Sequence, residues 1–259
     1  MPLRSPPVDP ATGWRVVGVD PAPSKPTVAF DGACFHTMAP DAVDAQIAAL
    51  TGGHDRVLLL WDAPLQMDPG AYYSRAVDVA AKEMVASWSH VLEDKAVGIA
   101  AAAQCPHNIL SMAVLGLPIG APRHGLRLLD DAAALASGGR WVAEVHPAVA
   151  LGWWYAQPSS GALRRLPRYK GRVGAVAAVR ADLAALLSPQ RAFIGAEAWA
   201  CLDPAAPGGG GPAITSDDQL DAWVAWLLGR MLLAGRAQLW RGAAEGPGQA
   251  SGGHYVMPT

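Results

Sequence analysis

The sequence has few cysteines and no long apolar run. Cys34, Cys105 and Cys201 are its three cysteines, and no two of them form a C-x-x-C pair. This spacing argues against a disulfide framework and against a structural zinc site, and it fits a reducing cytoplasm. No segment reaches the roughly 20 consecutive apolar residues of a membrane helix, and the start of the chain lacks the apolar stretch of a signal peptide. We therefore expect a cytoplasmic protein without membrane contact.

Charge is also sparse and nearly balanced. Charged residues make up 16% of the 259 positions, and 20 Lys and Arg face 22 Asp and Glu, which gives a net charge of −2. Such a balance provides no general attraction to nucleic acid or to anionic lipid, so any polyanion has to be bound by a local surface. The 51% hydrophobic content excludes a mainly disordered chain and is enough to fill a sizeable core.

Short apolar runs alternate with helical patterns along the chain. Strands are predicted at residues 14–20, 27–30, 33–38, 56–62 and 141–144, with further short strands at 191–193 and 254–257. Helices are predicted at residues 41–50, 72–93, 147–154, 176–187 and 216–234. An Asp31-Gly32 turn joins the second and third strands as a hairpin, so the sheet is mixed. We expect a single α/β domain spanning residues 1–259, with helices on both faces of the central sheet and a helical insertion at about 66–138.

Three predicted strands end in an acidic residue, namely Asp20, Asp62 and Glu144. In open α/β sheets, ligands bind in the crevice outside the carboxyl ends of the strands, so these side chains are candidates for one site. The alternative is local, because an aspartate at a strand end often bonds its own turn, and prolines follow both aspartates closely. Both interpretations stay open at this point.

Two further acids lie in the last predicted helix. Asp218 and Asp221 share one helix face with three small residues, Ala222, Ala225 and Gly229. Small residues allow a helix to lie close to a sheet, which would carry both acids toward the strand ends. A capping role in the first turn explains Asp218 equally well, but it explains Asp221 poorly because that residue lies one turn further into the helix.

Gathered carboxylates repel one another unless a cation lies among them. Hard oxygen ligands without cysteine select Mg²⁺ or Mn²⁺, so Asp20, Asp62, Asp218 and Asp221 are the predicted metal ligands. Two such ions about 4 Å apart activate water and stabilise the leaving oxygen in many nucleases. Glu144 is predicted to act as a ligand or a base.

A basic segment provides a counterpart to these acids. Between residues 163 and 180 the chain has six basic residues and no acid, and Tyr169 offers a ring for base stacking. Lys170, Arg172 and Arg180 are the predicted phosphate contacts, and His146, two residues after Glu144, is predicted to face the substrate. The alternative for the segment is a solvated loop, which is the commoner role of a charge run.

Four short motifs in this order resemble the domain of unknown function 429 family. They are G-V-D at 18–20, W-D-A-P-L at 61–65, E-V-H-P at 144–147 and D-D-Q-L-D-A at 217–222. The family is described as predicted ribonuclease H-like nucleases, so the resemblance implies a ribonuclease H-like mixed sheet opened by a three-strand meander. Its pattern of Lys, Gly and Arg appears here at Lys170, Gly174 and Arg180. The pair Asp218 and Asp221 also looks like the last-helix acids of RuvC-type resolvases.

These observations lead to a hypothesis of metal-dependent phosphodiester hydrolysis on DNA or RNA. Asp20, Asp62, Glu144, Asp218 and Asp221 would form the catalytic set. One alternative is phosphoryl transfer to a small metabolite, since sugar kinases use a related fold, although the chain lacks the glycine-rich phosphate loops of nucleotide-binding proteins. Another alternative is a binding module without catalysis.

Overall fold

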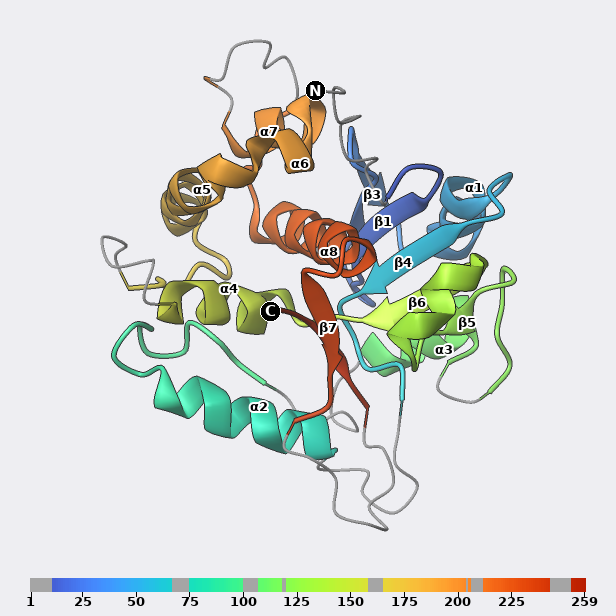
Figure 1. The fold of residues 1–259 in the computed structure, drawn as a ribbon, viewed down its shortest axis with the longest axis horizontal. Coiled ribbons are helices and arrows are strands. Elements are labelled where there is room, and N and C mark those ends of the chain that lie inside the picture. Colours follow the sequence, from blue (N-terminus) through green and yellow to red (C-terminus); the bar gives the residue numbers. More distant parts are fainter. Residues whose placement is uncertain are drawn as a thin grey trace, which may run out of the picture.

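The structure is a computed structural model that describes residues 11–66, 75–99, 107–117, 120–157, 165–203, 205, 212–242 and 253–259. A six-stranded mixed sheet lies at its centre (Figure 1). Three of the strand pairings are parallel and two are antiparallel. Across the sheet the order is β3 (Phe35–Met38), β2 (Thr27–Phe30), β1 (Arg15–Asp20), β4 (Val57–Trp61), β6 (Arg140–Glu144) and β5 (Arg127–Leu128). The predicted mixed α/β sheet and its opening meander are confirmed.

Helices cover both faces of the sheet because its strands are apolar on both sides. On one face, α1 (Val43–Thr51) and α3 (His107–Leu115) pack against side chains such as Val17, Val19 and Leu59. The other face packs against α8 (Asp217–Leu233) through side chains such as Val16 and Leu60. In Figure 1, α4 (Pro147–Ala156) and α2 (Ala76–Ser87) lie below α8, and α5 (Val173–Leu187), α6 (Arg191–Ile194) and α7 (Ala196–Leu202) lie above it and to its left. Two short 3₁₀ segments are η2 (Ala132–Ser137) and η4 (Ser188–Gln190).

Helix α8 lies directly on the backbone of β1 at Gly18, where the strand has no side chain to separate them. A Cβ atom at Gly18 would come within 2.2 Å of the Ala222 carbonyl oxygen and 2.3 Å of the Trp226 nitrogen. In the same way, a Cβ at Gly229 would come within 2.2 Å of a methyl group of Leu60. The small face of α8 is thus the face that packs on the sheet, as its spacing predicts, and the close approach brings the start of α8 to the carboxyl ends of β1 and β4.

Three details of the prediction differ from the structure. Residues 191–193, predicted as a strand, belong to α6; this helix stops at Gly195, which has a positive φ of 88°. The C-terminal strand β8 (Tyr255–Pro258) pairs with β7 (Ala237–Trp240) in a separate two-stranded sheet. The stretch predicted as a helical insertion also contains β5, which extends the central sheet. Each of these elements has four residues or fewer, so it carries too little periodicity to be recognised.

Two findings concern membranes and thiols. Within the described ranges, no helix combines the length and the apolarity that crossing a bilayer requires. Cys34 and Cys201 are free thiols, the first exposed and the second buried, and Cys105 lies outside the described residues.

Candidate metal centre

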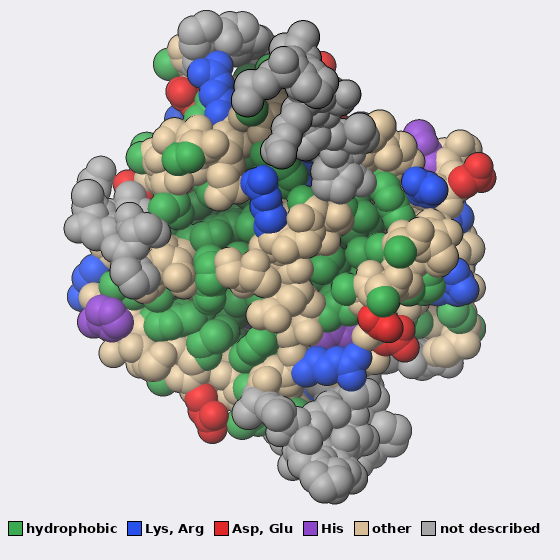
Figure 2. Space-filling view, in the orientation of Figure 1, with side chains coloured by type: hydrophobic (Ala, Val, Ile, Leu, Met, Phe, Trp, Pro, Cys, Tyr) green, Lys and Arg blue, Asp and Glu red, His purple; other side chains and the backbone are tan. Residues whose placement is uncertain are grey.

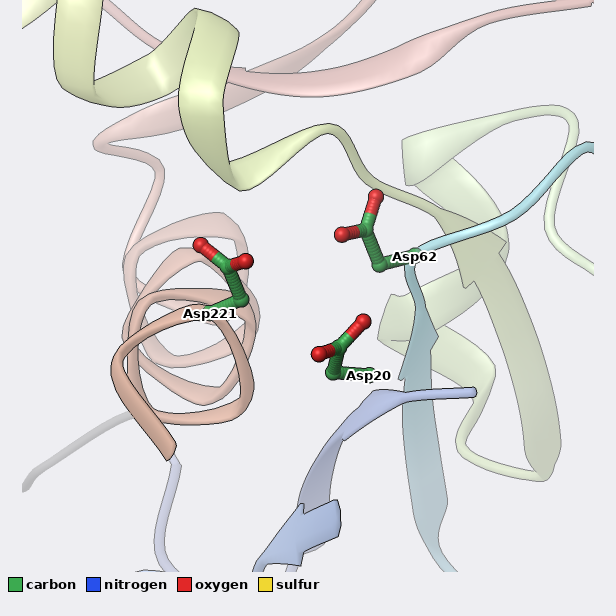
Figure 3. A group of neighbouring side chains, drawn as sticks. All are labelled: Asp20, Asp62 and Asp221. Atoms are coloured by element: carbon green, nitrogen blue, oxygen red, sulfur yellow. The ribbon is translucent and has the colours of Figure 1, made fainter. Parts of the chain in front are cut away.

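Three aspartates from distant parts of the chain meet at the carboxyl edge of the sheet (Figure 3). Asp20 is the last residue of β1, Asp62 directly follows β4, and Asp221 lies in the second turn of α8. One oxygen atom of each carboxylate lies within 4.8 Å of those of the other two, and the three side chains point toward one another. We refer to Asp20, Asp62 and Asp221 as the aspartate triad.

Local structure fixes two members of the triad, Asp62 and Asp221. The Asp62 N–H donates to the Val19 carbonyl at 3.0 Å, which continues the parallel ladder one residue beyond β4. At the start of α8, the Ser216 hydroxyl accepts a hydrogen bond from the Gln219 N–H at 3.2 Å and caps the helix. Asp221 follows on the face that packs against β1, where it is fully buried.

The triad is costly to ionise. Burial raises the pKa of Asp62 to about 8, and the nearby charges of Asp221 and Glu144 add to the effect. Burial followed by repulsion from Asp221 raises the pKa of Asp20 well above 3.8, and burial also raises the pKa of Asp221. Desolvation and mutual repulsion therefore act together, and a bound cation would relieve both.

Lys170 supplies a positive charge at this point. Its ammonium group donates to one carboxylate oxygen of Asp221, and the buried Tyr169 hydroxyl donates to the other oxygen at 2.8 Å. Burial alone would lower the pKa of Lys170, but the charge of Asp221, with those of Tyr169 and the rest of the triad, raises it well above its usual value. The Gly171 N–H donates to Asp217 at 3.1 Å, so this turn is docked on the start of α8.

The structure separates Asp218 from the triad. Asp218, predicted as a fourth metal ligand, accepts a hydrogen bond from the Lys25 ammonium at 2.5 Å, and its side chain is 20% exposed. Its charge still contributes to the raised pKa of Asp20. Lys25 lies in the turn that follows β1, so a lysine and an acid form a polar rim beside the triad.

Glu144, predicted as a ligand or base, lies in a buried ion network instead. Two nitrogens of the Arg75 guanidinium donate to its carboxylate at 2.6 and 2.8 Å, and the Leu65 N–H donates at 2.9 Å. Arg75 also holds Asp78 at 2.7 and 2.9 Å, and the Tyr255 hydroxyl donates to Asp78 at 2.5 Å. The network ties α2 and β8 to the end of β6, and its charges are already paired.

A cavity of about 350 Å³ opens beside the triad. Asp20 and Asp62 line it, together with the buried ion network. His146 contributes an Nδ1 atom that is buried and has no hydrogen-bond partner in the described part of the chain. Burial lowers the pKa of His146 to about 4, with a further contribution from Lys170, so its ring is neutral at pH 7. His107 also lines the cavity, and burial lowers its pKa.

The basic segment is divided by the fold. Lys170 and Arg168 line the cavity, whereas Arg172 is exposed at the start of α5 and Arg180 donates to the Ile214 carbonyl at 2.9 Å. Neither Arg172 nor Arg180 is among the residues that line the cavity. The predicted stacking role of Tyr169 is wrong, because its ring is fully buried and its hydroxyl is bound to Asp221.

Sequence reasoning missed Arg75, Lys25 and His107. Arg75 lies 69 positions before its partner Glu144, and no local motif signals such a pairing. Lys25 follows the first acidic strand end, so a search for cations near the acids could have found it. His107 is the first residue of α3 and reaches the cavity because this helix packs on the sheet.

The fold and the site define a mixed α/β protein with a three-aspartate centre at the carboxyl edge of its sheet. Residues 18–245 match the family described as "Protein of unknown function (DUF429)", and the chain belongs to that family. No curated protein and no solved structure gives a significant match. The family resemblance of the four motifs is thus confirmed, while the family's description assigns no activity.

Proposed function

We propose that this protein is a metal-dependent phosphodiester hydrolase with a ribonuclease H-like arrangement, acting on nucleic acid at the aspartate triad. The observation that carries the proposal is the convergence of three carboxylates, from β1, β4 and α8, with one oxygen atom of each within 4.8 Å of the other two. Repulsion between the three carboxylates does not stabilise the fold, so a functional role is the better explanation of their arrangement.

The donor set fits a hard divalent cation. The triad offers carboxylate oxygens without a sulfur ligand, which favours Mg²⁺ or Mn²⁺. When bound, such a cation would activate water and stabilise charge on the phosphate. The raised pKa values of Asp20 and Asp62 fit the same role, because a cation restores ionisation where burial and repulsion oppose it.

The other polar residues of the cavity have separate roles in this proposal. Lys170 and Arg168 would contact phosphate oxygens, since both are exposed and line the cavity next to the triad. The neutral ring of His146 can accept a hydrogen bond at Nδ1. The Arg75 network holds Glu144 in the cavity wall through two hydrogen bonds, so we give Glu144 a positioning role.

The test is cleavage of DNA and RNA substrates in Mg²⁺ or Mn²⁺. We expect single-stranded, duplex or branched substrates to be cut by the wild type, with losses of about 10²-fold or more in Asp20→Asn, Asp62→Asn and Asp221→Asn. Asp55→Asn is the matched control, because it makes the same change at an exposed position away from the site. Full activity in the triad variants would contradict the proposal.

Metal binding is measured separately from cleavage. We expect Mn²⁺ to raise the melting temperature of the wild type and of Asp55→Asn, and to leave the triad variants unchanged. A higher melting temperature in ATP and Mg²⁺, without cleavage of any polymer, would favour phosphoryl transfer to a small molecule. If neither metal changes stability or activity, a binding role without catalysis is the better explanation.

A further inference from the structure

The cavity beside the triad has a buried end and an open end. Arg75, Asp78, Glu144 and Tyr255, which line it on one side, are each at most 2% exposed. The lining residues Lys95, Arg168 and Lys170 are exposed. The buried ion network therefore forms a floor, and the three cations mark the mouth.

The size of the cavity limits what can enter. Its volume of about 350 Å³ lies at the small end of the range for small-molecule sites, roughly 300–1,000 Å³. A pocket of that size accommodates one nucleotide unit and not several.

The lining suits a nucleoside. Its uncharged wall includes small apolar residues that a base or a sugar can contact: Ala63, Pro64, Ala96, Val145 and Ala148. The His146 ring makes a hydrogen bond with the backbone of Gly98, and its buried Nδ1 has no partner among the described residues. A ligand in the cavity can therefore form one hydrogen bond with Nδ1. A buried polar atom without a partner is uncommon and is satisfied when a ligand supplies the missing group.

One face of the molecule shows no connected basic groove among its described residues. On the face shown in Figure 2, the Lys and Arg side chains of the described residues are scattered among hydrophobic and uncharged groups. A protein that tracks a continuous strand or duplex usually presents a connected basic surface. On this face, the charge pattern fits a short contact better than an extended one.

We propose that the cavity binds the terminal nucleotide of a single strand, and that the protein removes nucleotides one at a time from a chain end. This inference rests on the proposed function, because the triad at the side of the cavity performs the cleavage. Water adds across the terminal phosphodiester: a new bond forms between phosphorus and the water oxygen, the bond from phosphorus to the neighbouring sugar oxygen breaks, and that oxygen takes up a proton. The products are one mononucleotide and a strand shortened by one unit.

The experiment compares linear and circular single strands of one sequence, as DNA and as RNA, in Mn²⁺. We expect the linear strand to be degraded to mononucleotides at least about tenfold faster than the circle is opened. Opening of the circle at a similar rate would overturn the terminal-nucleotide inference and leave the proposed hydrolase intact.

A second measurement separates the two possible failures. Binding of a nucleoside monophosphate in Ca²⁺, measured by calorimetry, reports on the cavity without any cleavage. Binding without cleavage of either strand would support the cavity assignment and contradict the hydrolase. Absence of both binding and cleavage would contradict both proposals.

A matched pair of variants tests whether the mononucleotide occupies the cavity. Ala148→Leu adds volume at the cavity wall, and Ala181→Leu makes the same change on the exposed side of α5. We expect Ala148→Leu to lower mononucleotide binding and release by about tenfold or more, while Ala181→Leu leaves both unchanged. Equal binding and release in the two variants, with equal melting temperatures, would contradict the assignment.

Discussion

Replacing Asp62 with asparagine should stabilise the metal-free protein at neutral and alkaline pH. The pKa of Asp62 is raised from 3.8 to about 8 in the folded chain, mainly by burial. An acid whose folded pKa is raised costs folding free energy as the pH rises from the unfolded pKa to the folded pKa, because over this range the unfolded chain releases the proton and the folded chain keeps it. The wild type without metal should therefore lose stability between about pH 4 and pH 8, and an uncharged amide at this position should not take part in that loss.

The magnitude follows from the pKa difference. At pH 7, a carboxyl group with these two pKa values costs about 4 kcal/mol of folding free energy, at about 1.4 kcal/mol per tenfold change in proton affinity. This is an upper bound, because neighbouring groups relax and water enters such sites. We expect Asp62→Asn to be about 2–4 kcal/mol more stable than the wild type at pH 7 to 8.

The assay is denaturant unfolding in EDTA across pH 5 to 9, with Asp55→Asn as the control for the same chemical change at an exposed site. The free energy of unfolding of Asp62→Asn should exceed that of the wild type by an amount that grows with pH. This difference should disappear when Mn²⁺ is added, because the metal stabilises the wild type and not the variant. A flat pH dependence of the difference, or a variant that is less stable than the wild type at pH 8, would refute the reasoning.

Four other outcomes follow from the contacts. Lys170→Met should lower the metal-free stability by about 1–2 kcal/mol, since the Lys170 side chain is 45% exposed, and Mn²⁺ should restore more stability to the variant than it adds to the wild type in paired melting curves. Gly18→Ala should cost at least about 3 kcal/mol in denaturant unfolding because its methyl group meets the backbone of α8, whereas Gly174→Ala, with open space around it, should be neutral or slightly stabilising. Arg75→Met should cost about 3–5 kcal/mol by leaving two buried carboxylates without a partner, as the same unfolding assay would report. The Mn²⁺ affinity measured by calorimetry should rise by up to about tenfold per pH unit until about pH 8, because Asp62 must lose its proton to bind, and then level off.

The sequence was informative where a pattern is local. The three small residues spaced along the last helix predict that this face packs closely on the sheet, and Gly18 and Gly229 provide the close approach. The T-S-D-D sequence predicts where the helix starts, and Ser216 caps it there. The apolar runs that end in Asp20 and Asp62 predict neighbouring parallel strands, whose ends then lie together. Helix face, cap and strand end were enough to predict the members of the triad.

What could not be predicted depends on pairs that are far apart along the chain. Lys170 meets Asp221 from 51 positions away, and Arg75 meets Glu144 from 69 positions away. A basic residue in a sequence shows that a positive charge exists, but not which acid will neutralise it. The sequence therefore could not show which of the predicted acids would be paired with a cation. In the structure, Asp218 pairs with Lys25 and Glu144 pairs with Arg75, whereas Asp20 and Asp62 lie beside each other and Asp221.

The exclusion of Glu144 has a geometric cause in the register of the sheet. Successive side chains of a strand point to opposite faces, so a shift of one residue moves a side chain to the other face. In β4, Leu58 and Leu60 face α8, and Asp62 continues that alternation; in β6, Ala143 faces α8, so Glu144 does not. The pairing agrees, because Glu144 is level with Trp61 and Asp62 lies one residue further. The two acids thus end neighbouring strands with opposite orientations; both line the cavity, where Glu144 is held by the buried Arg75 and Asp62 faces Asp20 and Asp221.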